Sequence, residues 1–128
     1  MQGLRQAIAQ SGPSAALALE SRKAFAMQTQ ILVIDDDRDM CELLEESLGR
    51  AGYQVTWRTR GDEGLDVLRD RDFDVIITDL NLDGASGIDL CKRFTENRPD
   101  TPVIVITAFG DMSAAVNAIR AGAHDFIN

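Results

Sequence analysis

Cysteine and histidine, which often bind metals or act in catalysis, are scarce in this 128-residue sequence. It contains two cysteines, Cys41 and Cys91, and one histidine, His124. The cysteines lie far apart, without a CxxC spacing and beside apolar residues, so we expect two buried core thiols rather than a disulfide or a metal site. No serine or cysteine nucleophile stands in a recognisable setting, so the single histidine gives little support for a hydrolytic centre.

Long hydrophobic runs and an excess of basic residues are also missing. No apolar segment approaches the roughly 20 residues of a membrane-spanning helix, and we expect a cytoplasmic protein without a membrane partner. The net charge is −8, from 13 Lys+Arg and 21 Asp+Glu. Such an acidic surface repels phosphate backbones, which argues against direct binding of nucleic acid. Hydrophobic residues make up 45% of the chain, which is enough for the core of one globular domain.

The composition changes near residue 30. Residues 1–30 are rich in alanine, glutamine and serine and are interrupted by Gly12-Pro13, with weak helical patterns at 4–10 and 14–27. We therefore expect an N-terminal extension or arm over residues 1–30 and a compact domain over residues 31–128.

From Ile31 onward, short apolar runs alternate with amphipathic segments. This alternation predicts an α/β fold with a doubly wound, parallel, five-stranded sheet of flavodoxin-like order 2-1-3-4-5. Strands are expected at 31–34, 53–57, 75–79, 103–107 and 123–128, and helices at 38–49, 61–70, 87–97 and 111–121. No helix follows the fifth strand, so we expect one flank of the sheet to stay uncovered unless the arm or another chain lies on it. Helical spacing places Leu43, Val116 and Ile119 on buried faces.

Polar side chains follow three of these strands where each one ends. Asp35, Asp36 and Asp37 follow the first strand, Asp79 ends the third, and Thr107 ends the fourth. An aspartate before a helix is commonly a cap, but three in succession exceed what a cap requires. Clustered carboxylates repel one another, and a hard divalent ion such as Mg²⁺ relieves that repulsion. An aspartate beside such an ion is a reasonable nucleophile toward phosphorus, with a hydroxyl close by to bind the phosphoryl group.

The segments ILVIDDD, DVIITDLNLDGASG, VIVITA and GAHDFIN resemble the receiver domain of two-component response regulators, and the C-terminal part is most similar to the NtrC-like class. The resemblance covers about three quarters of the chain. It implies that a sensor histidine kinase phosphorylates Asp79. It also implies Mg²⁺ ligands from Asp36 directly, Asp35 mostly through water, Asp79 and the backbone carbonyl of Asn81, and a conformational switch formed by Thr107 and Phe126.

The sequence departs from the family pattern in three places. The family usually has a lysine, often followed by proline, directly after the fifth strand, and the printed sequence ends at Asn128, one position earlier. Asp83 replaces a proline that is usual four residues after the phosphoacceptor. The last helix, which commonly forms part of a homodimer surface, is absent. We expect a natural protein that continues with Lys-Pro, that helix and an output domain, by resemblance a sigma54-type ATPase with a DNA-binding domain.

Two alternatives differ in class from a phosphoacceptor switch, which would be no enzyme beyond self-phosphorylation and autodephosphorylation. One is a pseudo-receiver that only binds other proteins and is not phosphorylated. The other is a small phosphatase of the haloacid-dehalogenase type, whose DxDx[TV] motif is similar to Asp35–Asp39. Asp39 stands where that motif requires threonine or valine, and the length leaves no room for a cap domain.

Overall fold

The central element is a parallel sheet of five strands in the order β2-β1-β3-β6-β7. The computed structural model describes residues 2–9, 28–82, 85–107 and 112–127, and statements below refer to these residues. The strands are β1 (Gln30–Ile34), β2 (Gln54–Arg58), β3 (Val75–Asp79), β6 (Val103–Ile106) and β7 (Asp125–Ile127). The predicted doubly wound order 2-1-3-4-5 is confirmed, and the middle strands are the β-branched runs that sequence patterning indicated.

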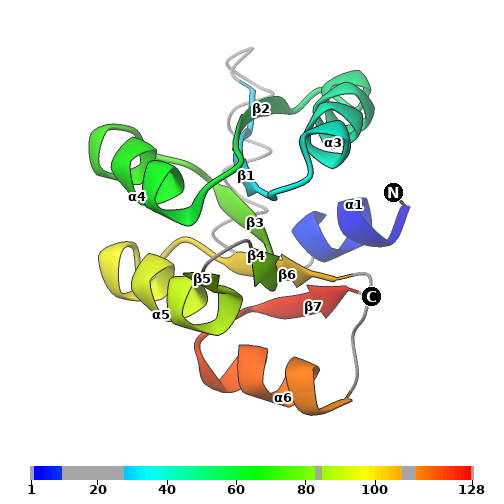
Figure 1. Ribbon diagram of the computed structural model, residues 1–128. Coiled ribbons are helices and arrows are strands. Elements are labelled where there is room, and N and C mark those ends of the chain that lie inside the picture. Colours follow the sequence, from blue (N-terminus) through cyan, green and yellow to red (C-terminus); the bar gives the residue numbers. More distant parts are fainter. Residues whose placement is uncertain (1, 10–27, 83–84, 108–111, 128) are drawn as a thin grey trace.

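Helices cover both faces of this sheet (Figure 1). They are α1 (Gln2–Ala9), α3 (Arg38–Arg50), α4 (Gly61–Asp70), α5 (Gly87–Asn97) and α6 (Met112–Arg120). Helices α4, α5 and α6 lie on one face, and α3 and α1 lie on the other. The weak helix expected at residues 14–27 lies outside the described residues.

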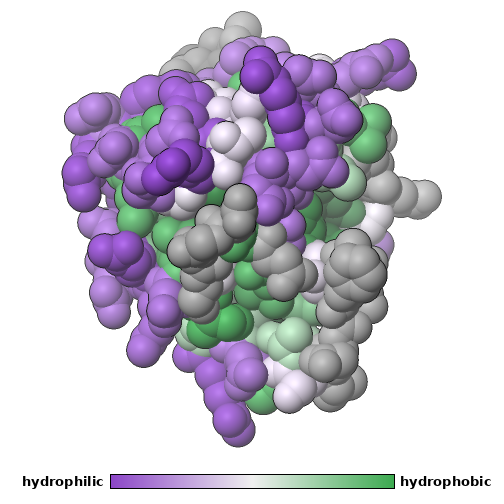
Figure 2. Space-filling view, viewed as in Figure 1, coloured by the Kyte–Doolittle hydropathy of each residue, from purple (hydrophilic) through white to green (hydrophobic). Residues whose placement is uncertain are grey.

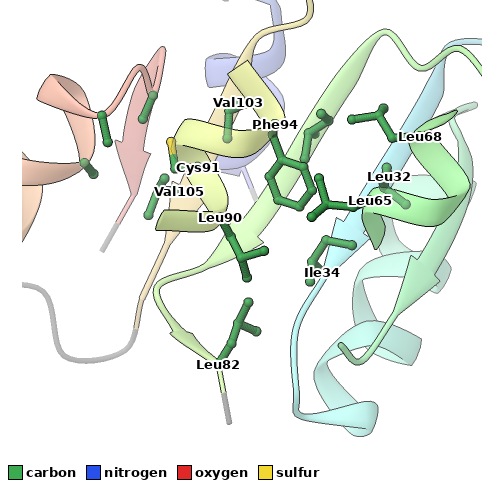
Figure 3. Packing of buried hydrophobic residues seen from close by; sticks show 14 of the residues in the cluster. Leu32, Ile34, Leu65, Leu68, Leu82, Leu90, Cys91, Phe94, Val103 and Val105 are labelled. Carbon is green, nitrogen blue, oxygen red and sulfur yellow. The ribbon is translucent and has the colours of Figure 1, made fainter. Parts of the chain in front are cut away.

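The core on the first face is built around Phe94 of α5. Its fully buried ring lies among Leu65 and Leu68 of α4 and Ile34 of β1 (Figure 3). Burying a side chain of this size contributes roughly 1.5–3 kcal/mol. These contacts join two helices to the sheet.

The core on the second face includes the N-terminal helix. Leu4, Ala7 and Ile8 of α1 are buried in the same cluster as Ile31 of β1 and Ile104 of β6. We expected one flank of the sheet to stay uncovered. Residues of the N-terminal arm cover part of it.

Three of the predicted buried positions are wrong. Leu43, Val116 and Ile119 are exposed, with relative exposures of 49%, 40% and 49%. In α3 the buried stripe is Cys41, Leu44 and Leu48, and in α6 the buried residue is Ala118. Small alanines allow α6 to pack close to α5 and β7, so the larger residues turn outward.

Both cysteines are buried and unpaired, as predicted. Among the described residues, no helix is long and apolar enough to cross a membrane.

Candidate functional site

The three aspartates after β1 are in three different environments. Asp35 is buried, with 4% relative exposure, while Asp36 and Asp37 are exposed. The Asp37 side chain is the N-cap of α3, because its Oδ1 accepts hydrogen bonds from the backbone N–H groups of Asp39 at 3.0 Å and Met40 at 3.4 Å. Asp37 therefore caps the helix, and the carboxylates of Asp35 and Asp36 are not needed for that role.

Asp79 lies beside that surplus because of the sheet register. Ile34 pairs with Thr78 across β1 and β3, so the residues that follow them, Asp35 and Asp79, come level at the carboxyl edge. Ligand atoms of Asp35, Asp36 and Asp79 all lie within 4.8 Å of one another. The predicted convergence of these side chains is confirmed.

Burial and repulsion by neighbouring carboxylates both raise the pKa of the Asp35 side chain. The pKa of the Asp35 carboxyl is raised to about 6, chiefly by desolvation, and the charges of Asp79, Asp36 and Asp37 raise it further. The backbone N–H of Asp37, which donates to Asp35 Oδ1 at 2.9 Å, opposes this shift. A carboxylate in this setting gains from a cation placed between it and its acidic neighbours.

Thr107 stands at the next strand end. Asp79 pairs with Ile106 across β3 and β6, so Thr107 lies one position beyond the level of Asp79. It is buried, and its N–H donates to the Ile127 carbonyl at 3.2 Å. Phe126, on β7, is half-buried against the core cluster on the α5 and α6 face. The sheet therefore brings Thr107 to the edge that holds the carboxylates, whereas Phe126 lies one strand further away.

Asn81 begins a short hairpin that the sequence did not predict. Strand β4 (Asn81–Leu82) pairs antiparallel with β5 (Ala85–Ser86) directly after Leu80. The hairpin turns the chain back into α5, where a Cβ on Gly87 would overlap the Leu80 carbonyl oxygen and Cα. Because no side chain fits there, the backbone following Asp79 stays close to the start of α5. Asp83 lies outside the described residues.

The donor set suits a hard divalent cation. All three side chains offer carboxylate oxygens, and the charges that act most on Asp35 are all acidic. Mg²⁺ prefers oxygen ligands and commonly uses one or two carboxylates with waters. The face of the molecule seen in Figure 2 shows hydrophilic residues over α3 and α4, and hydrophobic residues in the middle of the view.

The family model described as "Response regulator receiver domain" matches residues 31–128. The chain belongs to the response regulator receiver family. It is a receiver domain of two-component signalling, homologous to NtrC-type regulators of transcription.

Curated relatives agree over the same region of the receiver. Response regulator protein PilR of Pseudomonas aeruginosa is 38% identical over 96 residues, covering 75% of this chain and 22% of PilR. The DNA-binding transcriptional regulator NtrC of Klebsiella pneumoniae is 37% identical over 95 residues, covering 74% of this chain and 20% of NtrC. The chain therefore spans about a fifth of the length of these relatives.

Solved structures of receivers share the fold. The BeF3-activated DrrB receiver domain is 29% identical with a TM-score of 0.72, and the match covers 80% of this chain and 85% of that receiver-domain chain. A response regulator from Burkholderia pseudomallei, with a phosphorylated aspartic acid, calcium ion and citrate, is 31% identical with a TM-score of 0.75. The match covers 78% of this chain and 59% of that one.

Two hydrogen bonds at the carboxyl edge of the sheet were not predicted from the sequence. The Cys41 thiol donates to the Asp35 backbone carbonyl at 3.3 Å, and the Thr78 hydroxyl donates to the Asp79 carbonyl at 3.2 Å. Burial raises the pKa of the Cys41 thiol to about 11, which keeps it protonated as a donor. The position of Cys41, four residues after the cap Asp37, was the available signal, since it places the thiol on the first turn of α3, beside the end of β1.

Proposed function

We propose that this receiver accepts a phosphoryl group on Asp79 from a sensor histidine kinase. The observation that supports the proposal is the group of three carboxylates from two neighbouring strand ends, with ligand atoms within 4.8 Å of one another. Three acidic groups held at one edge, with one pKa raised to about 6, indicate a site that takes up positive charge.

Mg²⁺ is the proposed cofactor. Asp36 would bind it directly and Asp35 mostly through water, with Asp79 and the backbone carbonyl of Asn81 as the remaining protein ligands. When bound, the ion neutralises charge that develops on the phosphoryl oxygens. The calcium ion in the Burkholderia pseudomallei structure, which also holds a phosphorylated aspartic acid, supports a divalent site of this kind.

The transfer step forms one bond and breaks one. A carboxylate oxygen of Asp79 forms a bond to phosphorus while the P–N bond of the kinase phosphohistidine breaks, and the departing imidazole nitrogen keeps that electron pair. The product is an acyl phosphate on Asp79. The Thr107 hydroxyl would then donate to a phosphoryl oxygen, and Phe126 would move inward after it.

The output is proposed to be control of transcription. The relative NtrC is named as a DNA-binding transcriptional regulator, and the match covers 20% of its length. We infer an output part of the sigma54-type ATPase and DNA-binding kind, because the relatives that the receiver matches include NtrC. Phosphorylation at Asp79 would act on that part through the Thr107 and Phe126 strand ends.

Labelling of Asp79 tests the proposal. In Mg²⁺ with acetyl phosphate or phosphoramidate, we expect the wild-type protein, extended past Asn128, to gain one phosphoryl group, detected by intact mass and mapped to Asp79. Asp79→Asn should not label. Asp70→Asn removes an exposed aspartate at the end of α4 and should label like the wild type. Equal labelling of wild type and Asp79→Asn would contradict the assignment.

A Mg²⁺ titration separates the proposal from the pseudo-receiver alternative. Trp57 is a suitable fluorescent reporter because it pairs with Val33 of β1, close to the acidic edge, and lies under the Arg38 guanidinium at 5.5 Å. We expect a saturable response in the millimolar range that Asp36→Asn abolishes. A flat titration would favour a protein-binding module that takes up no phosphoryl group.

A further inference from the structure

Two buried side chains donate hydrogen bonds at the edge of the sheet that holds the three carboxylates. Cys41 of α3 and Thr78 of β3 are both fully buried. The Cys41 thiol donates to the Asp35 carbonyl at 3.3 Å, and the Thr78 hydroxyl donates to the Asp79 carbonyl at 3.2 Å. The two acceptors are therefore the backbone carbonyls of two residues whose carboxylates converge.

These two carbonyls lie where the pairing between β1 and β3 stops. The last residues paired across the two strands are Ile34 and Thr78. Asp35 and Asp79 follow them directly. A backbone carbonyl that is removed from water needs a hydrogen-bond donor, and within a sheet the neighbouring strand supplies it. Beyond the last pair of β1 and β3, the thiol and the hydroxyl act as donors instead.

The two donors approach from opposite faces of the sheet. Cys41 belongs to the core cluster on the α3 side. Ile76 of β3 belongs to the cluster on the α4, α5 and α6 side. Thr78 is two residues further along β3, and side chains two apart in a strand point to the same face. Each hydrogen bond therefore comes from a different layer of the fold, and each can be removed separately.

A carbonyl that is held in place also fixes the peptide that follows it. Because the peptide group is planar, the direction of the Asp35 carbonyl sets the direction of the Asp36 N–H and the path into that residue. In the same way, the Asp79 carbonyl sets the path into Leu80 and Asn81. Asp36 and Asn81 are ligands in the proposed metal site. The two donors therefore act on where these ligands lie.

We propose that Cys41 and Thr78 are positioning residues of the metal site. Their hydrogen bonds hold the two peptides that follow the acceptor carbonyls, and so bring the ligand oxygens together. Both side chains act through another residue, so neither is a catalytic residue. The effect on Mg²⁺ binding rests on the proposed function, whereas the hold on the two peptides rests on the hydrogen bonds alone.

Mg²⁺ titrations of the full chain, followed by Trp57 fluorescence, test the proposal. Cys41→Val and Thr78→Val remove the donor and keep a buried side chain of similar size. We expect the Kd for Mg²⁺ to rise about tenfold in each, the lower end of the range for residues that orient metal ligands. Cys41→Ser and Thr78→Ser keep a donor and should stay within about threefold of the wild type.

The stability of the same variants separates positioning from packing. Valine buries more apolar surface than serine, so with a chelator present the valine variants should unfold at a higher urea concentration than the serine variants. The order of stability is then opposite to the order of Mg²⁺ affinity. A role in packing alone would give the same order for both.

Cys91 and Thr29 provide matched controls. Cys91 is the other buried thiol, on α5, and Thr29 is a buried threonine whose hydroxyl has no hydrogen-bond partner in the part of the chain that the structure describes. Cys91→Val and Thr29→Val remove the same groups from other places in the core and should bind Mg²⁺ like the wild type.

Three outcomes of the titrations would overturn the proposal. One is wild-type affinity in Cys41→Val and Thr78→Val. Another is an equal loss of affinity in the valine and serine variants, which would assign the effect to packing. The third is an equal loss in the two control variants, which would show that any change to a buried residue weakens the site.

Carbonyl carbon shifts in NMR spectra of the metal-free protein test the hold on the peptides without the ion. Loss of a hydrogen bond moves the resonance of the acceptor carbonyl to lower frequency. We expect this change for Asp35 in Cys41→Val and for Asp79 in Thr78→Val, and a smaller one in the serine variants. Unchanged resonances would overturn the hold on the peptides. A wild type without a saturable Mg²⁺ response would contradict the metal site and with it the positioning role, while the carbonyl shifts would still decide whether the donors hold the peptides.

Discussion

At the scale of single residues, Asp35 makes the metal-free domain sensitive to pH. Its carboxyl titrates near 3.8 without the fold and at about 6 within it. The folded state therefore binds more protons than the unfolded state between those values, so stability falls as pH rises through this window. Below the window the penalty is absent, and above it the penalty is complete, with an upper limit of about 3 kcal/mol.

Asp35→Asn should therefore stabilise the metal-free protein at about pH 7.5 and change it much less at about pH 4. Asparagine keeps the oxygen that accepts from the Asp37 N–H, so the backbone contact survives. Urea unfolding with a chelator present, at both pH values, measures the difference. Asp70→Asn serves as the control for loss of one negative charge, and an equal effect of both variants at each pH would refute the role of burial.

Asp37 should contribute to helix stability and not to the metal site. Asp37→Ala removes the acceptor for the N–H groups of Asp39 and Met40, which should cost about 1 kcal/mol in the free energy of unfolding. Asp37→Ser keeps a capping oxygen and should recover most of that loss. Mg²⁺ affinity, followed by Trp57 fluorescence, should change far less than in Asp36→Asn. A loss of affinity as large as in Asp36→Asn would place Asp37 in the site.

Sequence patterning found the acidic group but could not assign its members. Asp35, Asp36 and Asp37 are equivalent as letters before a helix, and any one of them could be its cap. The assignment depends on where β1 stops, which its register with β3 decides, and that register is a property of the packed sheet. The Cys41 contact with the Asp35 carbonyl escaped for the same reason.

At the scale of elements, Gly87 controls the path from Asp79 into α5. A methyl group there would overlap the Leu80 carbonyl oxygen and Cα, which are backbone atoms that cannot turn aside. Gly87→Ala should cost about 1–3 kcal/mol as overpacking, and should weaken Mg²⁺ binding because the backbone after Asp79 must shift. Chemical denaturation and the Trp57 titration measure the two effects.

Gly49 provides the matched control for this substitution. It lies in α3, and a Cβ there meets nothing within 4 Å. Gly49→Ala should raise stability by roughly 0.5–1 kcal/mol, because alanine loses less backbone freedom in a helix. Mg²⁺ affinity should stay the same. If both variants were equally stable and bound the ion equally well, the close approach at Leu80 would not matter.

The order of strands and helices could be predicted from the sequence. Which residues of some helices are buried could not. Helices α4 and α5 have the predicted bounds, because their apolar residues repeat at helical spacing. In α6 the pattern favoured Val116 and Ile119, but Ala118 is the buried residue. Valine and isoleucine are more hydrophobic than alanine, so the pattern favoured them as buried residues. Because α6 packs close to α5 and β7, only the small alanine side chain fits between them. The β4 and β5 hairpin was too short to leave a pattern.

At the scale of the whole molecule, the acidic excess and the metal site make separable contributions to stability. With a net charge of −8, any added cation reduces self-repulsion, so a gain in stability with MgCl₂ alone would not identify a site. A specific site adds a saturable gain at constant ionic strength. At a free Mg²⁺ concentration tenfold above Kd that gain is about 1.4 kcal/mol.

Thermal or urea unfolding in MgCl₂, against NaCl of equal ionic strength, should therefore show this gain in the wild type and in Asp70→Asn. Asp36→Asn and Asp79→Asn each remove one of the three converging carboxylates and should lose most of it. They should also be more stable than the wild type without the ion, because each removes a charge that raises the pKa of Asp35. This opposite change, more stable when metal-free and less responsive to Mg²⁺, distinguishes ligands from residues that only add charge. An equal MgCl₂ response in all four proteins would assign the gain to screening and leave the carboxylates without a role in binding.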